Sequence, residues 1–174
     1  MNPIYERSAP TVTVRRARPA DAEAVRAIRN HAIEQSTALW TETPQSPAEG
    51  AAWLAAHLEH ASAFVAEVEG EVAGFAVYGP WRELDGFRDT VEDSIYVREG
   101  RQGLGIGSAL LDTLVTAARE AGHHVMIADI EAENAASVRL HERFGFQHVG
   151  TVREAGAKFG RRLDLTIMRL PLSR

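Results

Sequence analysis

The 174-residue chain contains no cysteine. A disulfide framework, a thiolate nucleophile and a cysteine-based metal site are therefore excluded. The chain also has no apolar run near the roughly 20 residues that a membrane span needs, and its N-terminus lacks the apolar core of a secretion signal. We therefore expect a soluble, cytoplasmic protein with no membrane partner.

Blocks of like charge are missing as well. The formal net charge is −5 at pH 7, and no basic cluster offers a surface to nucleic acid, so we expect no nucleic-acid partner. What is present is an ordinary globular composition, 45% hydrophobic and 25% charged, at a length that suits one domain. Residues 1–11 show no periodicity and are expected to form a flexible tail before a single domain over residues 12–171.

Hydrophobic periodicity predicts a mixed α/β fold on one sheet. Strands are expected over residues 11–15, 63–68, 72–78, 90–97, 123–130, 146–153 and 162–170. Helices are expected from residue 19 to about 33, from 46 to about 60, over 104–121 and from 134 to about 144. Residues 63–78 form a hairpin, whereas the strands at 90–97 and 123–130 are joined through a helix and pair in parallel. Residues 34–43 lack a clean period and are predicted to be a loop or short helix near a site.

The most informative stretch runs from Thr90 to Gly107, TVEDSIYVREGRQGLGIG, and combines a strand, a glycine-rich loop and the start of a helix. Closely spaced glycines before a helix let backbone N–H groups point at an anion, and the helix dipole favours negative charge there. Without a ligand, these glycines would weaken the start of the helix by about 0.5–1 kcal/mol each. The loop therefore predicts a phosphate-bearing ligand.

Spacing separates the candidate ligands. A P-loop needs a lysine beside its last glycine, and the single lysine of the chain, Lys158, is far from Gly107. A dinucleotide site needs Gly-x-Gly-x-x-Gly, whereas the spacing here is Gly103-x-Gly105-x-Gly107. One feature still favours the dinucleotide alternative: Asp129 lies on the next strand, about where a ribose-binding acid would lie.

The pattern Gln102-x-x-Gly105-x-Gly107 resembles the acetyl-CoA pyrophosphate loop of the GNAT family of N-acetyltransferases, and the resemblance extends over about residues 12–171. Further segments resemble the phosphinothricin and methionine sulfoximine (sulfone) N-acetyltransferase subfamily: 79–82, 85–88, 90–97, 134–141, 158–160 and 163–165. The resemblance implies a single-domain α/β fold whose mostly antiparallel sheet holds a central parallel pair, splayed to admit CoA. It also implies a homodimer.

The same resemblance implies which residues bind acetyl-CoA. They are Ile95, Tyr96 and Val97 for the acyl-pantetheine, Gln102, Gly103, Leu104, Gly105, Ile106, Gly107 and Ser108 for the pyrophosphate, and Asn134 with Ser137 for the pantetheine arm. Asn134 is equally suited to be a plain helix N-cap. No cluster at ligand spacing predicts a metal site.

Two residues are implied as catalytic. An ammonium group must lose a proton before the amine can attack a thioester, and Glu92 matches the subfamily glutamate proposed as that base. The alternative for Glu92 is a solvent-facing carboxylate on a strand. His141 matches the subfamily histidine that would assist the departing thiolate, because imidazole exchanges protons near neutral pH. Its alternative is a packing residue whose ring nitrogens are satisfied by hydrogen bonds.

The implied acceptor is a small, amino-acid-like zwitterion. Arg82 and Arg88 flank a loop from which guanidinium groups could hold a carboxylate, phosphinate or sulfone oxygen. An ordinary solvated charge is the alternative for each arginine. The residues expected around the acceptor are Trp40, Arg82, Asp85, Gly86, Phe87 and Arg88.

The sequence thus predicts an acetyl-CoA-dependent N-acetyltransferase for phosphinothricin, L-methionine sulfoximine or L-methionine sulfone. Since no cysteine is present to carry the acyl group, transfer would be direct. The alternatives are acetylation of another amine, such as a peptide N-terminus, and a non-catalytic acyl-CoA sensor. A sensor would have no use for a base at Glu92.

Overall fold

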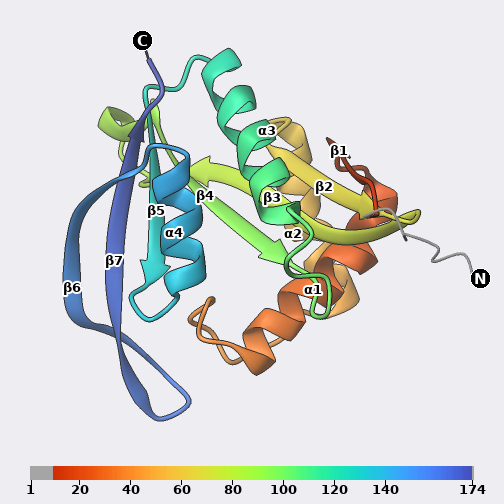
Figure 1. The fold of residues 1–174 in the computed structure, drawn as a ribbon, viewed down its shortest axis with the longest axis horizontal. Helices are drawn as coiled ribbons and strands as arrows, with labels where there is room; N and C mark the ends of the chain where they lie inside the picture. The colour runs from red at the N-terminus through yellow and green to blue at the C-terminus, as the bar shows by residue number, and fades with distance from the viewer. Residues whose placement is uncertain (1–9, 174) are drawn as a thin grey trace, which may run out of the picture.

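A seven-stranded sheet in the order β1-β2-β3-β4-β5-β7-β6 runs through the molecule (Figure 1). The computed structural model describes residues 10–173, so most of the tail predicted for residues 1–11 lies outside the described residues. The strands are β1 (Val12–Arg16), β2 (Ala63–Val68), β3 (Glu71–Pro80), β4 (Thr90–Val97), β5 (Val125–Glu131), β6 (Gln147–Lys158) and β7 (Arg161–Pro171). The helices are α1 (Ala22–Gln35), α2 (Pro47–Glu59), α3 (Ile106–Glu120) and α4 (Ala135–Arg143), with 3-10 turns at Pro19–Asp21 and Asp85–Phe87. None of the helices within residues 10–173 is long and apolar enough to cross a membrane.

The predicted fold class is confirmed. Among the described strands, β4 and β5 form the one parallel pair, and every other pairing is antiparallel. Helices α3 and α4 cover one face of the sheet, and α1 and α2 cover the other (Figure 1). Each face has its own apolar core, in which α3 buries Leu110 and Leu114 completely and α1 and α2 bury Ile28 and Leu54 against Phe75.

Side chains of β4 alternate between the two faces, as the pleat requires. Ile95 and Val97 pack against the core under α3 and α4, whereas Tyr96 packs against the core under α1 and α2. Residues of the same parity as Tyr96, including Glu92, therefore belong to the α1–α2 face. Asp93 belongs to the α3–α4 face.

The ends of two elements differ from the predictions. Helix α3 begins at Ile106 rather than near residue 104, because Gly103 and Gly105 adopt left-handed conformations, with φ of 80° and 79°, that a helix cannot include. Strand β6 continues to Lys158 rather than ending near residue 153. Register shifts at His148/Gly150 and Val152/Gly156 break the alternation on which a strand is recognised. Helix α2 begins where it was predicted, with a capping box in which the side chains of Ser46 and Glu49 each accept a hydrogen bond from the other's backbone N–H.

The feature that creates the site is the parting of β4 from β5. The two strands pair only where Thr90, Val91 and Glu92 face Val125, Met126 and Ile127. Beyond Glu92 they diverge toward their arrowheads (Figure 1). Backbone groups on the β5 side of β4 are therefore without a sheet partner after Glu92, which leaves them available to a ligand.

Candidate active site

The gap between β4 and β5 is a cleft, here called the central cleft. Its lining includes Glu92 and Asp93 from β4, Asp129 from β5, and Asn134 and His141 at the start and on the body of α4. The fold therefore brings together the two residues predicted to be catalytic, which lie on separate elements. Asp93 and Asp129 add two carboxylates that were not predicted to act.

Glu92 is the carboxylate whose ionisation the site alters most clearly. Burial raises the pKa of Glu92 to about 7, and the charges of Asp129 and Asp93 add to this rise. A general base is most effective when its pKa lies near the working pH. Glu92 therefore has the ionisation that a base at neutral pH would need, and its side chain is partly buried in the cleft.

Asp129 holds an unsatisfied atom. Its Oδ1 is buried and has no hydrogen-bond partner among the described residues. Burial raises the pKa of Asp129, while Trp81 and the charge of Arg82 oppose that rise. Because buried polar atoms are normally paired, this oxygen is a candidate acceptor for a donor on a ligand.

Asp93 and His141 form a buried pair. Nε2 of His141 lies 2.8 Å from Oδ2 of Asp93, and Nδ1 lies 2.7 Å from the carbonyl oxygen of Ser137. A carbonyl oxygen can only accept, so Nδ1 carries a proton, and an ionised Asp93 requires a proton on Nε2 as well. Burial lowers the pKa of His141, but the Asp93 hydrogen bond and charge, with the Ser137 carbonyl, outweigh it and leave that pKa raised. His141 thus lines the cleft with a raised pKa, and both of its ring nitrogens are satisfied by neighbours, so its position agrees with either interpretation.

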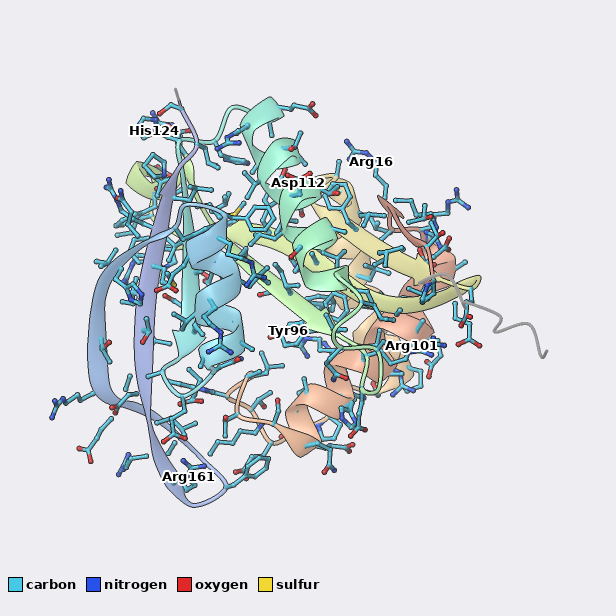
Figure 2. All side chains as sticks on the ribbon, in the orientation of Figure 1. Arg16, Tyr96, Arg101, Asp112, His124 and Arg161 are labelled. Carbon is cyan, nitrogen blue, oxygen red and sulfur yellow. The ribbon has the colours of Figure 1, made fainter. Side chains whose placement is uncertain are left out.

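A groove, here called the outer groove, continues from the central cleft toward the N-terminus of α3. Seven residues predicted to bind the cofactor line it: Ile95, Tyr96, Val97, Gln102, Gly107, Asn134 and Ser137. Figure 2 shows Tyr96 near the arrowhead of β4, where the strand has parted from β5. The groove thus joins the unpaired edge of β4 to the glycine loop.

Of the remaining loop residues, Ser108 has a partly exposed hydroxyl, and the others can serve a ligand only through their backbones. The side chain of Ile106 is buried in the core, and Leu104 packs against that core. The N–H groups of Ile106, Gly107 and Ser108 belong to the first turn of α3 and have no acceptor inside the helix. These donors are suited to a pyrophosphate, as the glycine spacing predicted.

Asn134 is an N-cap, as one of the two interpretations held. Its Oδ1 accepts a hydrogen bond of 3.2 Å from the backbone N–H of Ser137. The cap leaves its Nδ2 without a partner among the described residues. Because Asn134 lines both the central cleft and the outer groove, the amide can still serve a ligand.

The residues predicted around the acceptor do not gather in one cleft. Arg82 lies over the rings of Trp81 and Phe87, at 4.4 and 5.8 Å from their centroids. Arg88 is exposed and donates to the carbonyl oxygen of Asp85, while Trp40 packs closely over Gly156 of β6. None of the pockets described in this section includes Trp40 or residues 82–88 in its lining.

A third space, the side cleft, opens on the α1–α2 face of β4. It is lined by Arg29, Trp53 and His57 from the helices and by Glu92 and Tyr96 from the strand. Burial raises the pKa of Tyr96 to about 12, so its phenol stays neutral. The sequence analysis did not single out the three helical residues, because nothing local distinguishes them from other residues of amphipathic helices. Tyr96 lines the central cleft, the outer groove and the side cleft, so the three spaces adjoin.

Lys158 positions the loop that covers the central cleft. Its side chain is buried, and Nζ donates to the carbonyl oxygens of Ser36, Leu39 and Ala32 at 2.5, 2.7 and 3.4 Å. The ammonium group thereby caps the C-terminus of α1. Residues 38 and 39 line the central cleft, so the tip of the β6–β7 hairpin fixes one of its walls.

We expect Lys158→Met to loosen this wall. Three carbonyl oxygens would lose a charged donor, so the free energy of unfolding should fall by about 1–3 kcal/mol, as measured by urea denaturation. The KM for acetyl-CoA should rise more than kcat falls. Arg161→Met in the same hairpin is the control, because it removes only an exposed ion pair to Glu133 and should cost less than about 0.5 kcal/mol. Equal stability of both variants would contradict the positioning role.

The fold and the site together indicate one class of enzyme. A single parallel strand pair, parted over a cleft with a carboxylate at the fork and a glycine loop at a helix N-terminus, is the arrangement expected of an acyl-CoA-dependent acyltransferase. The chain belongs to the acetyltransferase (GNAT) family, whose model matches residues 25–146. It is an N-acetyltransferase, as the resemblance implied.

Curated relatives and solved structures agree with this assignment. The chain is 45% identical over 164 residues to the L-methionine sulfoximine/L-methionine sulfone acetyltransferase of Pseudomonas aeruginosa, covering 93% of this chain and 95% of that one. It is 42% identical over 149 residues to a phosphinothricin N-acetyltransferase of Streptomyces viridochromogenes, covering 86% and 81%. A GNAT phosphinothricin acetyltransferase of Sinorhizobium meliloti, solved in complex with acetyl-CoA, superposes with a TM-score of 0.90 at 36% identity, covering 94% of this chain and 89% of that one.

Proposed function

We propose that the enzyme transfers the acetyl group of acetyl-CoA to the α-amino group of small amino-acid analogues such as L-methionine sulfone, L-methionine sulfoximine or phosphinothricin. The observation that carries the proposal is Glu92, a carboxylate with a pKa of about 7 at the junction of the central and side clefts. The names of the curated relatives support the substrate class.

The residues of the outer groove fit acetyl-CoA. The edge of β4 beyond Glu92 has unpaired backbone groups that suit the amide-bearing pantetheine arm, and Asn134 offers a free amide beside it. The first-turn N–H groups of α3 suit the pyrophosphate. Acetyl-CoA supplies the activated acetyl thioester, and these residues would hold that thioester in the central cleft.

The chain's own residues would move the protons. Glu92 takes a proton from the acceptor ammonium, so that the amine lone pair can form the C–N bond while the C–S bond breaks. His141, protonated and lining the central cleft, is the proposed source of a proton for the departing sulfur. Since the chain has no cysteine, the acetyl group passes directly from donor to acceptor within one ternary complex.

The size of the side cleft favours a small acceptor. Its volume is about 190 Å³, below the roughly 300–1,000 Å³ of pockets that enclose drug-sized ligands. A single amino acid suits such a space better than a peptide. We also propose that the enzyme is a cytoplasmic homodimer, for which the exposed Val149 and Val152 on edge strand β6 offer a contact surface.

The test is CoA release with L-methionine sulfone, L-methionine sulfoximine, phosphinothricin and a panel of peptide amines. Turnover of one or more of the three analogues, with peptides far slower, is the expected result. Activity confined to peptides would contradict the substrate class. Tight acetyl-CoA binding without turnover of any amine would instead favour the sensor.

A further inference from the structure

Both ring nitrogens of His141 are occupied, although the departing sulfur of CoA needs a proton. Nε2 lies 2.8 Å from Oδ2 of Asp93, and Nδ1 lies 2.7 Å from the carbonyl oxygen of Ser137. Each ring nitrogen forms one hydrogen bond in the plane of the ring, so neither can reach the sulfur while both contacts hold. A proton from this buried pair therefore needs a group that stands between the imidazole and the cleft.

The hydroxyl of Ser137 has that position. Ser137 precedes His141 by four residues on α4, which places the two side chains on one face of the helix. Its Oγ lies 3.4 Å from Nδ1 of His141. Because Nδ1 carries a proton, Oγ accepts in this contact, and the hydroxyl proton itself has no acceptor among residues 10–173. Ser137 lines both the central cleft and the outer groove, so this free donor borders the space proposed for the thioester.

The other neutral donors that line the central cleft are less suited to this role. The amide of Asn134 does not give up a proton near neutral pH. The hydroxyls of Ser94 and Tyr96 belong to the α1–α2 face of β4, and among the described residues neither is hydrogen-bonded to a protonated side chain. Ser137 is thus the hydroxyl of this cleft that has an imidazole behind it.

Resting on the proposed function, we propose that Ser137 delivers the proton to the departing sulfur of CoA, with His141 as its source and Asp93 as the group that positions His141. As the C–S bond breaks, its electron pair stays on sulfur and takes up the hydroxyl proton of Ser137. The proton on Nδ1 of His141 moves to the serine oxygen, while Nε2 keeps its proton and its contact to Asp93. CoA leaves as a neutral thiol, and His141 regains a proton from solvent.

A buried and satisfied His141 can then still be the source of the proton. Although burial lowers the pKa of His141, the hydrogen bond and charge of Asp93, with the Ser137 carbonyl, raise it above its ordinary value. The ring therefore holds its proton to a higher pH than a histidine in water. The hydroxyl passes this proton on without requiring either buried contact to break beforehand, so Ser137 and His141 act in series.

Ser137→Ala tests the hydroxyl and should keep the helix. Alanine is the strongest helix former, and Asn134 caps α4 through the backbone N–H of residue 137, which the substitution retains. Acetyl transfer in single turnovers should slow by about 10²–10³, the cost of removing one hydrogen-bond donor from a developing negative charge. Ser137→Gly, which lacks the same hydroxyl, should show the same loss. Ser137→Thr keeps the hydroxyl and should recover most of the rate, and Thr116→Ala, at an exposed position of α3, is the control.

The thiol of bound CoA gives a readout without turnover. A hydroxyl that donates to sulfur favours the thiolate, so the pKa of the bound thiol should be higher in Ser137→Ala than in the wild type, by about 1. The ultraviolet absorbance of the thiolate measures this pKa in the complex with CoA alone. The titratable groups that line the central cleft and the outer groove are Glu92, Asp93, Tyr96, Asp129, Glu131, His141, His31 and Glu99. All of them are present in both proteins, so the difference isolates the hydroxyl.

A double variant tests whether the two groups act in series. His141→Gln alone should slow acetyl transfer, and adding Ser137→Ala should slow it little further, because the path of the proton is already broken. Losses that multiply would show that the two residues act separately, and would overturn the relay.

The outcomes also separate this role from the proposed function. A transfer rate or a thiol pKa that Ser137→Ala leaves unchanged would overturn the role of Ser137 and leave the proposed function intact. A wild type that acetylates peptide amines but no amino-acid analogue would overturn the proposed function itself. The titration of the bound thiol uses no acceptor, so it would still test Ser137 in that case.

Discussion

Glu92→Gln is expected to lower kcat by about 10²–10⁴, the range that a general base contributes. Gln keeps the shape of the side chain but cannot accept the proton of the ammonium group. The KM for acetyl-CoA should change little, because Glu92 lies at the fork of the strands and not along the outer groove. Steady-state CoA release measures both constants, and Glu120→Gln, at the exposed end of α3, is the control.

The pH profile gives this prediction a second readout. In the wild type, kcat/KM should rise with pH through about 7, as Glu92 loses its proton. That limb should disappear in Glu92→Gln. A variant that retains both the limb and the rate would show that another group is the base.

As pH rises, the free energy of unfolding should fall while kcat/KM rises. Because the folded pKa of Glu92 lies above its ordinary value of 4.5, the folded state holds a proton that the unfolded state releases, and stability falls as pH rises from 4.5 to about 7. Above pH 7 the Gln variant should therefore be more stable than the wild type, by roughly 1–3 kcal/mol after allowance for partial exposure. Below pH 4.5 the two should be equal.

The second large effect is expected at the buried pair. His141→Leu leaves the carboxylate of Asp93, whose side chain is 2% exposed, buried without its partner. Breaking a buried ion pair in this way costs about 3–5 kcal/mol of unfolding free energy. Asp93→Asn should cost less, about 1–3 kcal/mol, since the histidine can become neutral and the amide N–H of Asn can then donate to its unprotonated Nε2. Denaturant titration at pH 7 measures the difference.

The pair also predicts how stability varies with pH. The pKa of His141 is raised above its ordinary value of 6.5, so the stability it contributes is fully present below pH 6.5 and is lost as pH rises through the folded value. This window begins at pH 6.5, near the upper end of the Glu92 window, and the decline within it should be absent in His141→Leu. The control is His148→Leu, whose pair with Glu142 is exposed and is expected to be worth less than about 1 kcal/mol. Similar costs for the two histidine variants would contradict the buried pair.

Local patterns in the sequence were enough to predict the strand, the loop and the helix cap that line the outer groove. The strand at 90–97, the glycine loop and the cap at Asn134 each lie within one short stretch, and the structure gives each the predicted place. Glycine spacing constrains the backbone directly, because Gly103 and Gly105 adopt conformations that other residues avoid.

The acceptor half depends on contacts between distant segments. Arg29 lines the same cleft as Glu92 only because α1 packs on the face of the sheet to which that side chain belongs, and no spacing within α1 reveals this. Arg82 and Arg88 were singled out because their loop is rich in aromatic residues; in the structure Arg82 lies over two of those rings, and its charge acts on Asp129 of the central cleft. The bulges in β6 also interrupt its alternation, so the last five residues of the strand were not predicted. Those residues place Lys158 at the end of α1.

The burial of Lys158 has a chemical consequence for the enzyme itself. It is the chain's single lysine, it is 2% exposed, and three carbonyl oxygens hold its ammonium group. An enzyme that activates amines beside a reactive thioester therefore offers no lysine of its own for acetylation. An amine-reactive label would reach Lys158 only when the hairpin tip lifts from α1, so the rate of labelling reports how often that wall of the cleft opens.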